Sequence, residues 1–99
     1  MINHVVLFKL REFSDEEKIE VIAELKNKLL ALKDKIAELK YIEGGENYEL
    51  ESKGYDLALI THFNSVEDLD KYRVHPEHLK VVERVGQTTV ARAAVDFNF

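Results

Sequence analysis

The first ten residues alternate between two sets of side chains, as in a β-strand. Five of them would lie on one face: Ile2, His4, Val6, Phe8 and Leu10. Val5 and Leu7 belong to the opposite face and are apolar as well. The pattern therefore predicts a strand over residues 2–10 that is covered on both faces.

A helix is predicted to begin directly after Ser14. The Ser14 hydroxyl can accept a hydrogen bond from the amide of Glu17, and the Glu17 carboxylate can reach back to the Ser14 amide, which makes a capping box. Apolar residues then recur at helical spacing: Ile22, Leu25, Leu29, Leu32 and Ile36. A coiled coil would use the same spacing, but about two heptads are too few for one, so we expect this stripe to pack on a sheet.

Two further strands are predicted between this helix and the next capping motif. Residues 38–50 alternate weakly, and we interpret Gly44-Gly45 as a bend or bulge in this strand. Lys53-Gly54 supplies the turn into residues 55–63, which are rich in β-favouring side chains on both faces. This third segment is therefore predicted to be a central strand.

A second helical region and a last strand complete the pattern. Ser65 can cap the helical region, and Pro76 divides it in two. Its apolar positions are Val66, Leu69, Tyr72, Leu79, Val82 and Val85. After Gly86, residues 88–99 alternate again and predict the strand that closes the domain.

The predicted order is strand, helix, strand, strand, helix, strand. This is the split βαβ arrangement, an α+β fold in which a four-stranded antiparallel sheet carries its helices on one face. The other face would expose apolar side chains of the first and third strands, a larger patch than soluble monomers usually tolerate. We therefore expect a homodimer that packs sheet against sheet.

Composition narrows the classes of function. A chain of 99 residues fits a single domain, residues 1–99, and four Gly with one Pro leave no room for a disordered linker. The net charge of -5, with basic residues scattered among acidic ones, argues against nucleic acid as a partner. The absence of Cys excludes disulfides and thiolate chemistry. The apolar run at the start is too short for a signal peptide or a membrane span, so we expect a cytoplasmic protein.

The residues best suited to chemistry lie around Pro76. Imidazole titrates near neutral pH, so His78 is a candidate general base for a proton on a carbon next to a carbonyl. The Tyr72 phenol could donate a hydrogen bond to the oxygen where charge develops. A structural interpretation is also open, in which Tyr72 packs its ring under the sheet and His78 caps the broken helix.

Four more residues are candidate ligand contacts. His75 precedes Pro76 and is forced into an extended backbone, so we expect its ring chiefly to fix the loop by a hydrogen bond. His4, on an otherwise apolar strand face, is either a satisfied core histidine or a polar group lining a pocket between sheet and helices. Phe8 and Leu59 would supply apolar contacts in that pocket.

Neither a metal nor a cofactor is expected. His75 and His78 flank Glu77, but zinc motifs on a helix need an i, i+4 pair and a third ligand from elsewhere. The chain carries no nucleotide-binding fingerprint. Any reaction is therefore expected to run on side chains alone.

Three segments of the chain form a recognisable set. They are His4-Val5-Val6-Leu7-Phe8, Gly54-Tyr55-Asp56 and Tyr72-Arg73-Val74-His75-Pro76-Glu77-His78. With them the chain resembles the stress-responsive A/B barrel family, also called the Dabb domain, over essentially its whole length. The resemblance implies a ferredoxin-like βαββαβ subunit that pairs through its sheets into a dimeric α+β barrel.

The resemblance also implies roles for individual residues. A few plant relatives look like polyketide cyclases that perform aldol-type ring closure, with the Tyr and the second His of the last segment as acid/base pair. These positions correspond to Tyr72 and His78, and the histidine of the first strand corresponds to His4. That branch has another histidine early in the third strand, where this chain has Asp56-Leu57-Ala58, with His62 further on.

We therefore expect a homodimer that binds a small, mainly apolar or carbonyl-bearing ligand between sheet and helices. His78 and Tyr72 would supply cofactor-free acid/base chemistry in this hypothesis. An alternative is a stress-associated structural dimer without catalysis. A third interpretation, a cofactor-free monooxygenase, rests on fold-level analogy alone.

Overall fold

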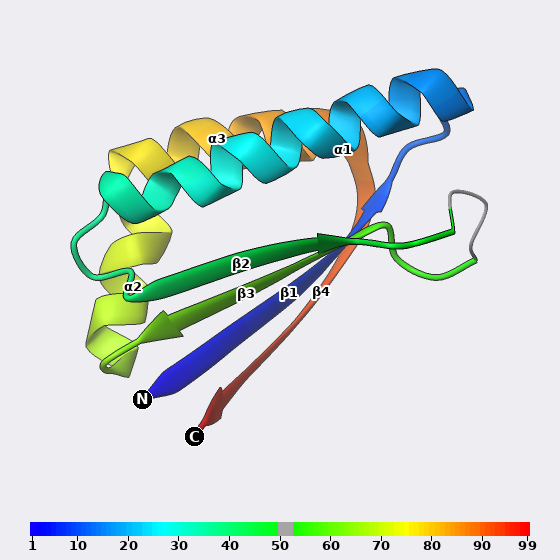
Figure 1. The fold of residues 1–99 in the computed structure, drawn as a ribbon. Coiled ribbons are helices and arrows are strands. Elements are labelled where there is room, and N and C mark those ends of the chain that lie inside the picture. The colour runs from blue at the N-terminus through cyan, green and yellow to red at the C-terminus, as the bar shows by residue number, and fades with distance from the viewer. Residues whose placement is uncertain (50–52) are drawn as a thin grey trace.

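The computed structural model describes residues 1–49 and 53–99 as one antiparallel sheet with helices on a single face (Figure 1). The elements follow in this order: β1 (Ile2–Leu10), α1 (Asp15–Leu30), the 3₁₀-helix η1 (Ala31–Asp34), β2 (Tyr41–Glu46), β3 (Leu57–Phe63), α2 (Val66–Val74), α3 (Pro76–Thr88) and β4 (Thr89–Asn98). The strand order is β2-β3-β1-β4, with both termini at one end of the sheet. The predicted ferredoxin-like α+β fold is confirmed. Leu50, in the predicted second strand, lies outside the described residues.

Serine side chains cap the starts of α1 and α2, as predicted. The Ser14 hydroxyl accepts from the Glu17 amide at 3.2 Å, which is one half of the predicted capping box. The other half differs, because the Glu17 carboxylate accepts from the Ser14 hydroxyl, at 2.9 Å, in place of the Ser14 amide. The Ser65 hydroxyl accepts from the Asp68 amide at 3.2 Å and caps α2. Each cap satisfies backbone donors that have no partner inside the helix, so it fixes where the helix begins.

The core lies between the sheet and α1. The predicted inner face of β1 is buried throughout, and the apolar stripe of α1, η1 and the turn after η1 packs above it. The stripe residues are Ile22, Leu25, Leu29, Leu32 and Ile36, all at most 6% exposed. Each such side chain contributes roughly 1.5–3 kcal/mol when fully buried. The stripe therefore holds the helix to the sheet, as the sequence predicts.

The predicted irregularity at Gly44-Gly45 is wrong. Gly44 pairs with Leu59 and Gly45 pairs with Ala58 in unbroken register. A Cβ at Gly44 would come within 3.3 Å of the Lys26 Cγ on α1, so the missing side chain gives room for α1 above β2. The glycine thus serves close packing of helix and strand, and β2 stays regular there.

The buried face of α3 does not coincide with its apolar positions. Leu79 and Val82 are 51% and 44% exposed, while Val81 and Thr88 are buried together with Val85. Residues 81, 85 and 88 are spaced to share one face of a helix, and so are residues 79, 82 and 85. Because residue 88 is a threonine, hydropathy alone favours the second set, of which only Val85 is buried. The Thr88 hydroxyl donates to the Arg84 carbonyl at 3.1 Å, so this buried polar group has a hydrogen-bond partner.

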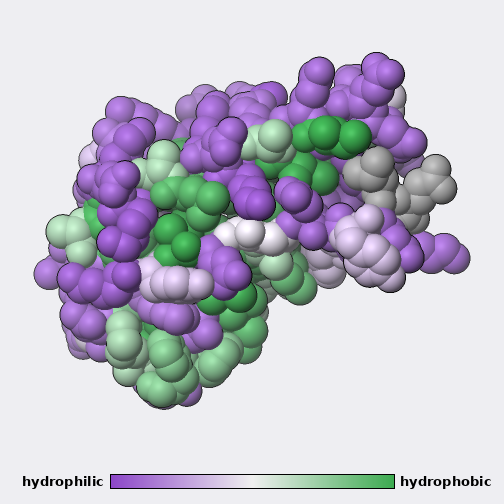
Figure 2. Space-filling view, in the orientation of Figure 1, coloured by the Kyte–Doolittle hydropathy of each residue, from purple (hydrophilic) through white to green (hydrophobic). Residues whose placement is uncertain are grey.

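The last strand presents its more apolar side chains away from the helices. The register places Asp96 beside His4 and Arg92 beside Phe8, so the polar set of β4 faces inward. The outward set includes Val95 and Phe97, which are 56% and 45% exposed. With Val5 and Ile60 on neighbouring strands they form the outer sheet face. In Figure 2, hydrophobic side chains gather low in the view, where the ends of β1 and β4 lie.

Candidate functional site

A cavity of about 90 Å³ lies between the inner face of the sheet and the helices. Its apolar walls are Val6, Phe8, Leu29, Leu59, Val82 and Val85. Its polar lining consists of His4, Tyr72, His78 and Arg92. Strands β1, β3 and β4 thus provide the floor, and α1, α2 and α3 provide the roof.

Five of the six residues singled out in the sequence lie on this cavity: His4, Phe8, Leu59, Tyr72 and His78. The cavity lining does not include His75. The His75 backbone is extended, and its ring Nδ1 accepts from the Glu77 amide at 3.1 Å as the cap of α3. Its predicted role in fixing the loop is confirmed, and its ring is engaged outside the cavity.

Tyr72 occupies the last turns of α2 and is only 1% exposed. Its ring packs against Phe63 at a centroid distance of 5.0 Å and against His78 at 4.2 Å. Burial raises the pKa of the Tyr72 phenol to about 12. None of the described residues forms a hydrogen bond with its hydroxyl. At neutral pH the group is therefore an uncharged donor.

His78 lies in the first turn of α3 and is half-buried. Its Nδ1 is 3.1 Å from the Arg73 carbonyl oxygen, and since a carbonyl only accepts, Nδ1 carries the hydrogen in the neutral ring. That tautomer leaves Nε2 with a lone pair. Burial lowers the pKa of His78 below its ordinary value, although the hydrogen bond to Arg73 opposes this shift. His78 thus has the properties of a neutral base.

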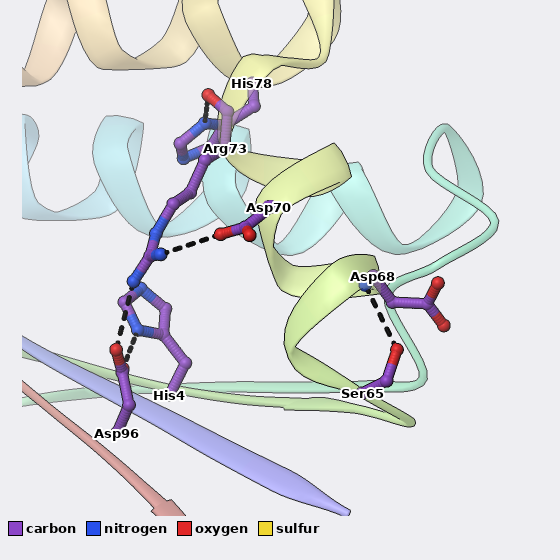
Figure 3. A network of polar contacts seen from close by, with 7 residues as sticks. All are labelled: His4, Ser65, Asp68, Asp70, Arg73, His78 and Asp96. Atoms are coloured by element: carbon purple, nitrogen blue, oxygen red, sulfur yellow. Dashed lines mark hydrogen bonds and ion pairs between the residues drawn. The ribbon is translucent and has the colours of Figure 1, made fainter.

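His4 is held by a polar network that joins β1, β4 and α2 (Figure 3). Its Nδ1 hydrogen-bonds to one carboxylate oxygen of Asp96, and the other oxygen lies 3.0 Å from the Arg73 guanidinium, which also contacts Asp70 at 3.1 Å. Burial favours the neutral form of Asp96, but His4 and Arg73 outweigh it and lower the carboxyl pKa. The carboxylate therefore fixes the orientation of the His4 ring.

Sequence reasoning missed Asp96 and Arg92 at this site. Both lie on the face of β4 that carries fewer apolar residues. A sequence pattern normally assigns such a face to solvent. The signal was a pair of charged residues four apart on a strand that is otherwise apolar. Only the pairing of β4 with β1 shows that this face lies on the same side of the sheet as His4 and Phe8.

Two other features are absent from the described part of the chain. In residues 1–49 and 53–99 no three His, Asp or Glu side chains are grouped so that they could hold a metal ion. Within the same ranges, no helix combines the length and the apolarity needed to cross a membrane.

The fold and cavity define a ferredoxin-like subunit with a small pocket between its sheet and helices. Over residues 2–99 the chain matches the Stress Responsive A/B Barrel Domain (Dabb), and it belongs to this family. No curated protein matches it.

Solved structures agree with this assignment. A dimeric protein of unknown function with a ferredoxin-like fold from Bacteroides fragilis is 35% identical, with a TM-score of 0.90 over 99% of this chain and 95% of that chain. A dimeric ferredoxin-like protein of unknown function from Thermobifida fusca is 26% identical, with a TM-score of 0.79 over 99% and 90%. The hydroxynitrile lyase from Passiflora edulis is 16% identical, with a TM-score of 0.71 over 97% and 90%, and shares the fold.

Proposed function

We propose that the protein is a homodimer whose cavity binds a small, mainly apolar, carbonyl-bearing molecule and transfers a proton within it. The observation that carries this proposal is the contact between a neutral imidazole and a neutral phenol on a mainly apolar cavity. The rings of Tyr72 and His78 lie 4.2 Å apart, and both residues line that cavity. Convergent polar groups in an apolar pocket are typical of small-molecule sites.

The two groups have complementary roles in such a reaction. The His78 Nε2 would take a proton from the carbon next to the carbonyl, and the C–H electron pair would move into the forming enolate. The Tyr72 hydroxyl would donate a hydrogen bond to the oxygen that becomes negative. Return of the proton from His78 to carbon or oxygen restores the site, so the chemistry needs no cofactor.

The cavity limits the size of the molecule. Its volume of about 90 Å³ is well below the roughly 300–1,000 Å³ of sites for drug-sized ligands. It equals the liquid volume of about three water molecules, at roughly 30 Å³ each. The part of the ligand that reaches Tyr72 and His78 is therefore short.

The outer sheet face supports the homodimer. Its apolar side chains on β1, β3 and β4 face away from the protein's own core. Pairing with a second copy would bury them, and the similar proteins from Bacteroides fragilis and Thermobifida fusca are described as dimeric. The hydroxynitrile lyase with this fold adds only the analogy that such a subunit can carry an enzyme.

A thermal-shift screen of short oxo acids, their amides and small phenols tests the proposal. A ligand present at 100 times its dissociation constant adds about 2.7 kcal/mol of stability, which corresponds to roughly 10–20 °C for a domain of this size. We expect His78→Ala to remain folded and to lose this shift. His75→Asn is the matched control, because Asn also caps helices and His75 does not line the cavity; it should retain the shift.

A purely structural role gives a different result. The near-complete burial of Tyr72 against Phe63 is the observation that favours it. In that case no compound stabilises the wild-type protein, and His78→Ala lowers the melting temperature in the absence of ligand. That combination would overturn the proposed function in favour of a non-catalytic dimer.

A further inference from the structure

We propose that Arg92 makes the cavity selective for ligands that carry a carboxylate, so that the preferred ligand is a short oxo acid. This inference rests on the proposed function and names the class of molecule for the same site.

Arg92 lies on the inner face of the last strand. It pairs across the sheet with Phe8, and both residues line the cavity. Because β4 is at the edge of the sheet and Arg92 is exposed, its guanidinium can reach the mouth of the cavity. A ligand could therefore insert its apolar part and leave a charged group beside Arg92.

The other three arginines are already engaged. Arg84 holds Glu24 through two nitrogens, at 2.7 and 2.9 Å. Arg73 is shared between Asp70 and Asp96, and Arg11 donates to the Gln87 carbonyl at 2.9 Å.

Within the described residues, Arg92 has neither an ion pair nor a hydrogen bond. The cavity lining that the structure describes contains no carboxylate. An unpaired arginine beside this cavity, in a chain of net charge -5, is consistent with an anion that comes from outside.

The Arg92 charge also reaches the proposed acid/base pair. Burial raises the pKa of the Tyr72 phenol, and the Arg92 charge opposes this rise. Burial lowers the pKa of His78, and the Arg92 charge lowers it further. All three groups also line the same cavity. A guanidinium binds a carboxylate through two parallel hydrogen bonds, which would fix the direction in which the ligand enters. The carbonyl at the other end of a short oxo acid would then point to Tyr72 and His78.

Titration calorimetry with matched ligand pairs tests the inference. The probes are pyruvate, acetoacetate and levulinate, each compared with its own amide, which has the same shape but no charge. For the oxo acid whose length fits the cavity, we expect the wild-type protein to bind the acid roughly tenfold more tightly than its amide. Arg92→Gln should remove this preference and leave amide binding unchanged. Arg92→Lys should keep part of it, because it retains the charge and loses the two-pronged geometry.

Arg11→Gln is the control, since it removes the same charge at a residue outside the cavity lining. It should behave as wild type. If acids and amides bind wild type equally, or if Arg92→Gln keeps the preference for acids, the inference is wrong while the proposed cavity function stands. If neither acids nor amides bind wild type, the proposed function itself fails and the inference falls with it.

Discussion

Replacing Asp56 with alanine is expected to lower the free energy of unfolding by about 3–5 kcal/mol, a loss typical of breaking a buried ion pair. Asp56 is 1% exposed and stands directly before β3. Its Oδ1 lies 2.8 Å from the Lys18 ammonium, and its Oδ2 accepts from the Leu10 amide at 2.8 Å. Its own amide donates to the Phe8 carbonyl at 2.8 Å. One carboxylate therefore connects the end of β1, the start of β3 and the first turn of α1.

Chemical denaturation of three variants checks this expectation. Asp56→Asn keeps an oxygen for the Leu10 amide but loses the charge opposite Lys18, so its stability should lie between those of Asp56→Ala and wild type. Glu83→Ala, an exposed change on α3, is the control and should stay within about 0.5 kcal/mol of wild type. An Asp56→Ala protein within about 1 kcal/mol of wild type would show that the buried pair contributes little.

Replacing Ile60 with lysine is expected to convert the proposed homodimer into monomers. Ile60 lies on the central strand β3, beside Val5 on β1, and faces away from the helices. A lysine there would place a charge in the middle of an apolar interface, and two-fold symmetry would place it there twice. We expect the dimer dissociation constant to rise roughly 100-fold or more, since each 1.4 kcal/mol is a factor of ten.

Sedimentation velocity over a range of protein concentrations measures this effect. The control is Ile19→Lys, which adds the same charge at a 54% exposed position on α1. The control should remain a dimer, while Ile60→Lys should sediment as a folded monomer. An unchanged dimer in Ile60→Lys would mean that the outer sheet face is not the interface.

Most of the fold could be predicted because its signals are local. The capping motifs at Ser14 and Ser65 and the alternation of β1 depend only on neighbouring residues. Two features depend on more than the local sequence. Gly44 fits a bulge as well as a close helix contact, and only the position of α1 distinguishes them. The burial of Thr88 in place of Leu79 and Val82 depends on how α3 packs on the rest of the protein, which hydropathy does not show.

The residues of the candidate site also differ in whether the local sequence could identify them. Tyr72 and His78 are six residues apart in the sequence, and Pro76 between them marks the junction of two helices, so their proximity could be predicted. Asp96 and Arg92 could not be found this way, because the inner face of β4 is defined only by its register with β1. From hydropathy alone, Val95 would be assigned to the inner face of the sheet. Its position on the outer face fits the proposed dimer, in which the partner subunit would provide a second apolar surface.

Histidine-ring NMR over a range of pH, with and without a short oxo acid, tests directly whether His78 is a neutral base that meets the ligand. We expect the His78 pKa to lie below the ordinary value of 6.5 and neutral His78 to carry its proton on Nδ1. Addition of the acid should shift the ring signals of His78 and leave those of His75 in place. A His78 that titrates at or above its ordinary pKa and responds to none of these compounds would mean that it is not the base of a ligand-binding cavity.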